Sequence, residues 1–214
     1  MHLNLWKQQL GRVPDAVWDA VDLETLVLAD NGLTEIPERI GELKQLRMVD
    51  LGHNRLARLP DSLGDLDGLT DFLYLHDNQL TSLPPSIARL TRLRYLNVSG
   101  NAMTTLPDAI CALASLVELR ASDNHFTNLP PSIERLACLR ELHLRNNRLT
   151  TVPDTIGHLT ELRHIDLRGN PLVSLTPRLA ALPKLDKLDL RWVSTLGDLP
   201  WLDDLEARGC LVYR

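Results

Sequence analysis

Leucines recur along the chain at two different spacings, and the two spacings alternate. The stretch LRELHLRNNRLTTVPDTIGHL places Leu142 and Leu144 two residues apart, and then Ile156 and Leu159 three residues apart. A spacing of two indicates a short strand with one buried face, whereas a spacing of three fits one turn of a short helix. The stretch therefore predicts a strand followed, after a turn, by a helical turn.

The same pattern repeats along nearly the whole chain, and each copy carries one asparagine. These residues are Asn31, Asn54, Asn78, Asn101, Asn124, Asn147 and Asn170. Every step between them is 23 residues, except for a step of 24 between Asn54 and Asn78. Around each asparagine the chain follows the frame LxxLxLxxNxLxxLPxxIGxLxx, and Gln8 and Val193 stand at the asparagine position at the two ends. A strand as short as LxL is unstable alone, so the copies must stack and share one core.

This frame resembles the leucine-rich repeat family, in the subclass whose repeats contain LPxxIGxL, as in plant intracellular Ras-group-related and bacterial repeat proteins. The resemblance implies an α/β fold: a right-handed solenoid, or horseshoe, with a concave parallel β-sheet of about ten strands and short helical or 3-10 turns on its convex side. We expect a single domain over residues 1–214. Residues 1–22 would form a partial N-terminal repeat, residues 23–190 the regular repeats, and residues 191–214 a C-terminal cap.

The asparagines and prolines of the frame have architectural roles. An Asn amide at the turn after each strand can bond backbone groups of neighbouring copies that would otherwise be buried without a partner. A proline six residues later fixes φ and prevents the strand from continuing. These prolines are Pro37, Pro60, Pro84, Pro107, Pro130 and Pro153.

Two departures from the frame change the expected structure locally. In LTDFLYLHDN one extra residue precedes the strand, which predicts a bulge or a loosened turn and leaves the facing of Phe72 open. Beyond Leu190 the frame breaks, and a shortened LxxLxLxxC predicts one more strand, with Cys210 buried in place of an asparagine. Its outward residues would be Asp204, Glu206 and Arg208.

Alternate strand residues should point outward on the concave face. In the middle of the chain these positions collect aromatic residues, methionine and polar neighbours. The residues that we expect to contact a partner there are Met48, Phe72, Tyr74, His76, Tyr95 and Asn97. The chain has only four Trp, three Tyr and two Phe residues, so three aromatic residues together at outward positions favour a protein-binding hot spot. The alternative is that they pack along the strands and bind nothing.

The outward positions of the C-terminal half are mostly charged. The further residues that we expect to contact a partner are Arg120, Glu141, His143, Arg145 and Arg168. An arginine column stands beside an acidic column, comprising Arg145, Arg168, Arg191 and Arg208 against Asp166, Asp189 and Glu206. The arginines either grip an acidic peptide, since their forked donors match carboxylates, or pair internally with the acids.

Two pairs on adjacent strands have the residue types of a catalytic base or a metal site: His143 beside Asp166, and Glu141 beside His164. No Ser or Cys nucleophile stands at an outward position among them, and no GxSxG, P-loop, HExxH or GxGxxG motif occurs. An open sheet also provides no enclosed pocket for chemistry. We therefore expect neither an enzyme, nor a metal site, nor a cofactor.

Composition and charge narrow the class of partner. The net charge of −5 disfavours nucleic acid and anionic membranes as partners. The first residues lack the pattern of a signal peptide, and Cys111, Cys138 and Cys210 suggest neither disulfides nor zinc ligation, so we expect a monomeric, cytoplasmic protein. Delivery into a host cell would leave the same sequence pattern.

The function that these observations predict is non-enzymatic recognition of a protein or peptide on the concave face. Two alternatives stay open. The repeats would select the substrate of a larger effector or signalling enzyme of ubiquitin-ligase or kinase type, or they would form a purely structural, self-associating protein.

Overall fold

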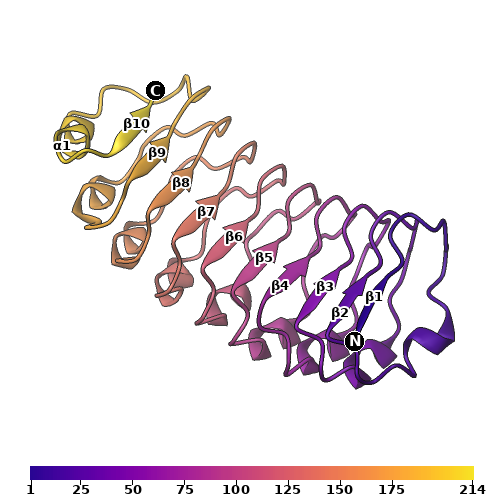
Figure 1. Cartoon of the computed structure of the whole chain (residues 1–214). Coiled ribbons are helices and arrows are strands. Elements are labelled where there is room, and N and C mark those ends of the chain that lie inside the picture. Colours follow the sequence, from indigo (N-terminus) through magenta and orange to yellow (C-terminus); the bar gives the residue numbers. More distant parts are fainter.

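Ten short parallel strands form one open sheet in the computed structural model, which describes all of residues 1–214 (Figure 1). The strands lie side by side in their order along the chain. They are β1 (His2–Asn4), β2 (Thr25–Val27), β3 (Met48–Asp50), β4 (Phe72–Tyr74), β5 (Tyr95–Asn97), β6 (Glu118–Arg120), β7 (Glu141–His143), β8 (His164–Asp166), β9 (Lys187–Asp189) and β10 (Leu211–Tyr213). The predicted parallel sheet of about ten strands is confirmed.

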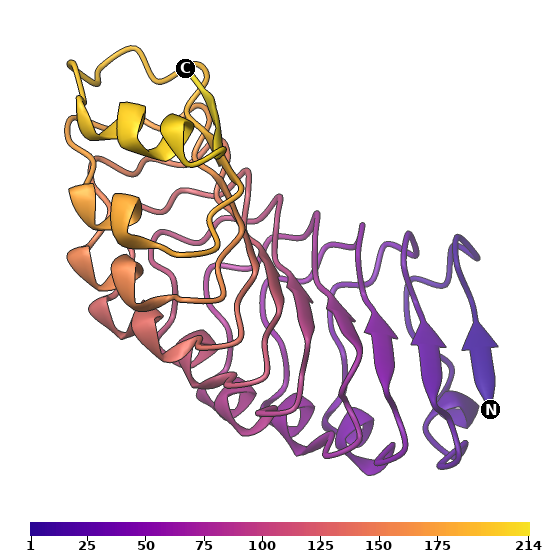
Figure 2. The same ribbon diagram turned by 60° about the vertical axis from the view of Figure 1, so that its left-hand side comes forward.

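A short 3-10 helix follows each of the first eight strands on the side away from the sheet. Figure 2 shows the strands on the concave inner side of the arc and the helices on its convex outer side. The helices are η1 (Asp15–Val17), η2 (Glu38–Glu42), η3 (Asp61–Asp65), η4 (Pro85–Arg89), η5 (Ile110–Ala112), η6 (Pro131–Arg135), η7 (Asp154–His158) and η8 (Pro177–Ala181). The helical turns predicted on the convex side are confirmed. None of the helices has the length and apolar character needed to cross a membrane.

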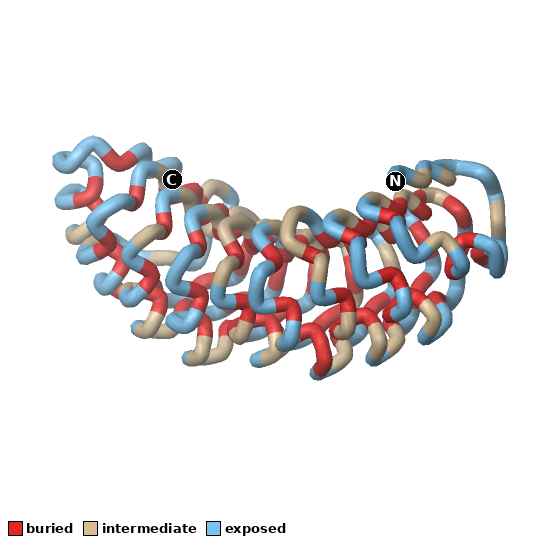
Figure 3. Tube along the Cα trace, turned by 60° about the horizontal axis from the view of Figure 1, so that its bottom comes forward, coloured by how far each residue is buried: buried red, intermediate tan, exposed pale blue.

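One continuous apolar core runs through the stacked copies, and Figure 3 shows buried segments recurring in successive turns along the arc. Leu142 and Leu144, the inward residues of the opening stretch, have no exposed surface, and Ile156 and Leu159 of the following turn are likewise buried. The core therefore contains the residues that the alternation of spacings assigns to it. Because each copy packs only against its neighbours, the strands form a stiff array rather than a mobile loop surface.

The asparagine ladder joins successive copies through the backbone. Asn147 Nδ2 donates to the carbonyl oxygens of Ala121 and Leu144 at 2.9 Å each, and Asn147 Oδ1 accepts from the Phe126 amide at 3.1 Å. One side chain thus satisfies backbone groups of its own copy and of the preceding one, all of them buried. The predicted role of the asparagines is confirmed.

The extra residue of the 24-residue step lies at the entry to β4. There the amides of Arg94 and Tyr95 donate to two successive carbonyl oxygens, those of Thr70 and Asp71, at 3.1 Å each. In neighbouring repeats the equivalent two amides share one carbonyl. The insertion is therefore absorbed before the strand, and Phe72 keeps its register and faces the concave side.

The predicted position of the last strand is wrong. Its residues form the chain's α-helix, α1 (Trp201–Ala207), and β10 begins only at Leu211. Leu202 and Leu205, three residues apart, are buried on one side of this helix, so the helical spacing prevails over the alternating one. The three residues predicted to face outward from a strand, Asp204, Glu206 and Arg208, lie on or directly after α1, away from the concave sheet.

Cys210 is buried as predicted, with 5% of its surface exposed, but it does not replace an asparagine. It comes directly before β10, whereas the asparagines of the frame follow their strands. Burial raises the pKa of its thiol, so the thiolate is disfavoured and Cys210 acts as a small apolar core residue. All three cysteines of the chain are free thiols.

Candidate functional site

The concave face carries all eleven side chains predicted to contact a partner. Each stands at an outward position of β3 to β8, or two residues beyond such a strand. The structure brings them into two groups. The first, which we call the aromatic cluster, consists of Phe72, Tyr74 and Tyr95. The second, the ionic half, comprises the charged residues from β6 to β9.

The aromatic cluster is a compact set of three rings on two neighbouring strands. The ring centroids of Tyr74 and Tyr95 are 5.0 Å apart, those of Phe72 and Tyr95 5.4 Å, and those of Phe72 and Tyr74 5.9 Å. Phe72 keeps 42% of its surface exposed, and both tyrosines are half-buried. The rings support one another and still present apolar surface to the outside, which is the arrangement that a binding hot spot requires.

The tyrosine hydroxyls of this cluster are neutral hydrogen-bonding groups. Burial raises the pKa of Tyr95 to about 12, with Arg120 opposing the shift. Burial and the nearby Asp50 carboxylate also raise the pKa of Tyr74. Both hydroxyls therefore keep their protons at physiological pH and can donate as well as accept. The guanidinium of Arg120 lies 5.9 Å from the centre of the Tyr95 ring and adds a cation to the edge of the cluster.

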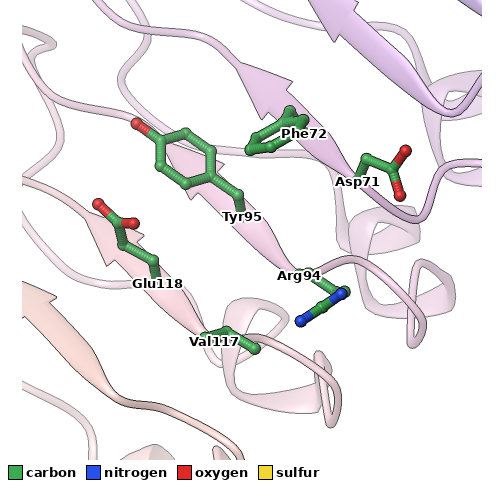
Figure 4. Close-up of a pocket in the computed structure, with 6 residues that line it drawn as sticks. All are labelled: Asp71, Phe72, Arg94, Tyr95, Val117 and Glu118. Carbon is green, nitrogen blue, oxygen red and sulfur yellow. The ribbon is translucent and has the colours of Figure 1, made fainter. Parts of the chain in front are cut away.

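A hollow of about 330 Å³ opens beside Phe72 and Tyr95. Figure 4 shows Phe72, Tyr95 and Glu118 in one row across three neighbouring strands, with Asp71, Arg94 and Val117 in a second row beside them. The lining residues are Asp71, Phe72, Arg94, Tyr95, Val117 and Glu118. Four of these were missed in the sequence. Glu118 stands at an outward strand position and could have been included, whereas Asp71, Arg94 and Val117 each come directly before the first residue of a strand, outside the alternating positions.

His76 and Asn97 flank the aromatic cluster and are partly committed to the scaffold. The ring of His76 covers Gly52 so closely that an added Cβ atom would clash with the imidazole. Burial lowers the pKa of His76, so its ring is neutral at pH 7. Asn97 Oδ1 accepts from the Ser99 amide at 3.0 Å. Met48, on the neighbouring β3, is half-buried next to Phe72 in the strand register.

Two members of the arginine column, Arg168 and Arg191, are paired internally with acids. Arg168 donates to both carboxylate oxygens of Asp166, at 2.8 and 2.5 Å, and Arg191 donates to both of Asp189, at 3.0 and 2.8 Å. Asp166 and Asp189 stand at the outward strand positions, but they are only 4% and 1% exposed, because the arginines fold over them. The sequence left open whether these arginines bind an acidic peptide or pair with the neighbouring acids; at Arg168 and Arg191 the structure shows the internal pairing.

The charge of Asp189 should stabilise the fold in a pH-dependent way. Burial alone would raise its pKa, but hydrogen bonds from Arg191 and the charge of Arg168 outweigh burial and hold the pKa below its ordinary value. The stabilisation is therefore complete above the unfolded-state pKa of about 3.9 and is lost as the pH falls through the lower folded-state value.

Asp189→Asn should consequently lower the free energy of unfolding by roughly 1–3 kcal/mol at pH 7, and the difference from wild type should shrink below about pH 4. Urea unfolding at both pH values measures it. Asp203→Asn, at an exposed carboxylate, serves as the control and should change little. A difference that is the same at both pH values would contradict the role assigned to the charge.

Trp192 is a functional candidate that the sequence did not reveal. Its ring centre lies 5.4 Å from the guanidinium of Arg145, 5.7 Å from that of Arg168 and 5.9 Å from that of Arg191. The side chain is 65% exposed, and its backbone adopts a left-handed φ of 63°. In the repeat frame it stands directly before the asparagine position, where the other copies place residues such as Asp30 with the same φ sign. This position in the repeat frame is the signal from which the sequence could have predicted that Trp192 lies in an exposed turn.

Two histidines and two glutamates converge on β6 to β8. His143 Nε2 lies 3.2 Å from Glu141 Oε2 and 3.7 Å from Glu118 Oε1, and His164 Nδ1 lies 3.9 Å from Glu141 Oε2. Glu141 and His164 are therefore neighbours as expected, but 3.9 Å is longer than a hydrogen bond. Asp166 stands opposite His143 in the register, but its carboxylate is held by arginine. Burial, then the neighbouring His143, lowers the pKa of His164, which is neutral at pH 7.

A family profile described as leucine-rich repeat region matches residues 71–208. No curated protein sequence matches the chain. Solved structures do. A leucine-rich repeat protein of Leptospira interrogans is 24% identical, with a TM-score of 0.75, over 96% of this chain and 64% of its own. This likeness concerns the fold.

Two other similar structures come from proteins whose role is described, one a membrane receptor kinase and one a type III effector. The leucine-rich repeat ectodomain of the Arabidopsis thaliana membrane receptor kinase GASSHO1/SCHENGEN3, in complex with CASPARIAN STRIP INTEGRITY FACTOR 2, is 30% identical, with a TM-score of 0.83, over 99% of this chain and 26% of its own. The leucine-rich repeat domain of the type III effector XopL is 26% identical, with a TM-score of 0.68, over 88% of this chain and 74% of its own. The chain therefore spans less than two thirds of the Leptospira and Arabidopsis proteins.

Proposed function

The chain belongs to the leucine-rich repeat family, and from this membership we propose that it is a non-enzymatic recognition module that binds a protein or peptide on its concave face. The receptor ectodomain that it resembles was solved with a bound factor. The partner would lie across the strands, and we further propose that the module works as a monomer in the cytoplasm, as the sequence predicts.

The aromatic cluster is the single observation that carries this proposal. Three rings stand together at outward strand positions, beside a hollow of about 330 Å³ that can receive one side chain of a partner. Interior packing does not require them there, because the leucines already fill the core below. Large, rigid aromatic residues lose little conformational entropy on binding, which is why they dominate protein interfaces.

Charge around the cluster favours a partner of mixed polarity. The hollow contains the carboxylates of Asp71 and Glu118 and the guanidinium of Arg94, while Arg120 stands at its rim. An apolar or aromatic side chain flanked by a basic residue would fill the hollow and pair with the carboxylates. Such rim charges contribute chiefly to selectivity and to the association rate, and the rings contribute most of the affinity.

The test is capture of the partner by wild type and by the Tyr74→Ala/Tyr95→Ala double variant. Each substitution should weaken binding by about tenfold, or ~1.4 kcal/mol, with little change in melting temperature because both side chains are half-buried on the surface. An affinity pull-down from lysate identifies candidates, and calorimetry with the purified partner measures the change.

Trp6→Ala is the matched control for this test, because Trp6 is an exposed aromatic residue on the first repeat, outside the cluster. It should bind like wild type. Full binding by the tyrosine double variant would argue that the partner uses another surface.

A second candidate function is selection of a substrate for an attached enzyme domain. The likeness to the repeat domain of the effector XopL favours it, and delivery into a host cell would then be the expected route. The same concave face would serve, so the double variant would also lose binding. A ubiquitin-ligase or kinase domain encoded beside this segment would distinguish the two cases. For the third alternative, a self-associating scaffold, light scattering across a range of concentrations is the test.

A further inference from the structure

The His and Glu residues of β6 to β8 converge more closely than the sequence pattern suggested. One ligand atom each of Glu141, His143 and His164 lies within 4.8 Å of the other two. The three residues come from two adjacent strands whose register sets Glu141 directly opposite His164. From the sequence, these residue types on adjacent strands were compatible with a metal site, but the absence of a metal-binding motif argued against one; the convergence of the side chains across the strands now favours it.

We propose that Glu141, His143 and His164 form a binding site for a divalent transition-metal ion, with Zn²⁺ as the ion that suits them best. Two imidazole nitrogens and one carboxylate are a common ligand set for zinc in proteins. Ligand atoms at zinc-bond distances from a tetrahedral ion lie about 3.4 Å apart. Glu141 Oε2 lies 3.2 Å from His143 Nε2 and 3.9 Å from His164 Nδ1, and all three ligand atoms lie within 4.8 Å of one another, so no separation must close by more than about 1.4 Å.

The present hydrogen bonding of His164 supports this assignment. Its Nε2 atom is buried and has no hydrogen-bond partner within the protein, and Nδ1 is 3.9 Å from the nearest carboxylate oxygen of Glu141. A half-buried imidazole whose nitrogens make no hydrogen bond within the fold indicates that these atoms have another role. Neither ring nitrogen of His164 makes a side-chain hydrogen bond, so Nδ1 is free to coordinate a metal ion while the proton stays on the buried Nε2.

The neighbouring charges leave room for a cation. Lys187 follows His164 in the strand register, and its ammonium lies 5.5 Å from the Tyr213 ring centre, although its charge still acts on His164. Glu118 Oε1 is 3.7 Å from His143 Nε2, so a second carboxylate stands at the edge of the site. Arg120 bonds that carboxylate at 2.6 Å and offsets its charge, which leaves Glu141 as the primary oxygen ligand.

A second group, His53, His76 and Asp77, also meets within 4.8 Å but is a weaker candidate. His53 and Asp77 stand in the left-handed turn after their strands, both have positive φ, and both side chains are at least half exposed. A metal site needs ligands held by rigid elements. This group therefore provides the comparison for the test.

The experiment is a calorimetric titration of Zn²⁺ into the full chain, previously treated with a chelator and dialysed, with no partner present. We expect saturable binding of one Zn²⁺ per chain. His143→Gln, His164→Gln and Glu141→Gln should each weaken it by about tenfold or more. Co²⁺ in place of Zn²⁺ should give visible absorption bands that the same variants lose. Circular dichroism and the urea midpoint establish that each variant is folded.

Two controls make the result specific. His53→Gln removes a ligand of the second group, and His158→Gln removes a convex histidine that contacts Glu134. Both should bind Zn²⁺ like wild type. The proposal is overturned if the chain binds no Zn²⁺, if His143→Gln and His164→Gln bind it normally, or if His53→Gln abolishes the binding instead. Because no partner takes part, this outcome is independent of the proposed function.

Discussion

Leu144→Ala should lower the free energy of unfolding by about 2–5 kcal/mol. Leu144 has no exposed surface and lies on the inward side of the chain directly after β7, where the side chains of neighbouring copies surround it. Truncation removes apolar contacts and leaves a cavity that the stacked copies cannot close, since both adjacent turns are fixed by their own hydrogen bonds. Unfolding in urea, followed by circular dichroism, measures the change.

Leu211→Ala is the matched control for this prediction. Leu211 is also a leucine next to the sheet, at the start of β10, but 58% of its surface is exposed. Its truncation should change the free energy of unfolding by much less. If the urea midpoint of Leu144→Ala equalled that of wild type, the inward assignment of the leucines would be wrong, and the outward assignment of the aromatic cluster would have no basis.

Asn147→Ala should have the next largest effect and lower the free energy of unfolding by about 2–4 kcal/mol. The substitution leaves the carbonyl oxygens of Ala121 and Leu144 and the amide of Phe126 without the bonds that the side chain supplies. Each buried backbone group left unpaired costs ~1–3 kcal/mol, and water entering the vacated space would recover part of the total. The same urea experiment measures it.

Asn128→Ala is the control, because Asn128 is exposed and its amide makes only a 3.5 Å contact with the adjacent Thr127 hydroxyl. It should unfold at the wild-type urea concentration. Equal stability of Asn147→Ala and wild type would mean that the ladder of asparagine bonds is dispensable, and that stacking of the leucines alone sets the register between copies.

The two predictions on stability bear directly on the proposed function. The aromatic cluster and the zinc-site residues lie on strands only three residues long, which have no rigidity of their own. The buried leucines and asparagines directly beneath them hold these strands in register. A variant that loosens this support should therefore weaken both binding activities even though it touches neither site.

What the sequence determined by itself is the repeated architecture. The period, the inward leucines, and the asparagines and prolines of the regular copies are local patterns, and each pattern has one physical reading that holds wherever the frame is kept. The outward positions follow from the alternation along the strand. For this reason Tyr74 and Tyr95 could be selected as neighbours before their distance was known, whereas the facing of Phe72, next to the inserted residue, was decided by the structure.

What only the tertiary structure decided are the relations between side chains on different copies. Whether an arginine reaches into solvent or folds over an acid depends on rotamers and neighbours some 23 residues away, so the burial of Asp166 and Asp189 could not be read from alternation. The stack of Trp192 on three arginines and the convergence of His143 with His164 arise in the same way.

The C-terminal helix shows the same limit for secondary structure. Residues 201–207 contain leucines at a helical spacing and a partial alternation at once, so the local pattern supports both a helix and a strand. Packing of Leu202 and Leu205 against the last core layer selects the helix. A repeating local pattern thus fixes the scaffold, whereas choices between two local conformations, and contacts across copies, are made by the packing of distant residues.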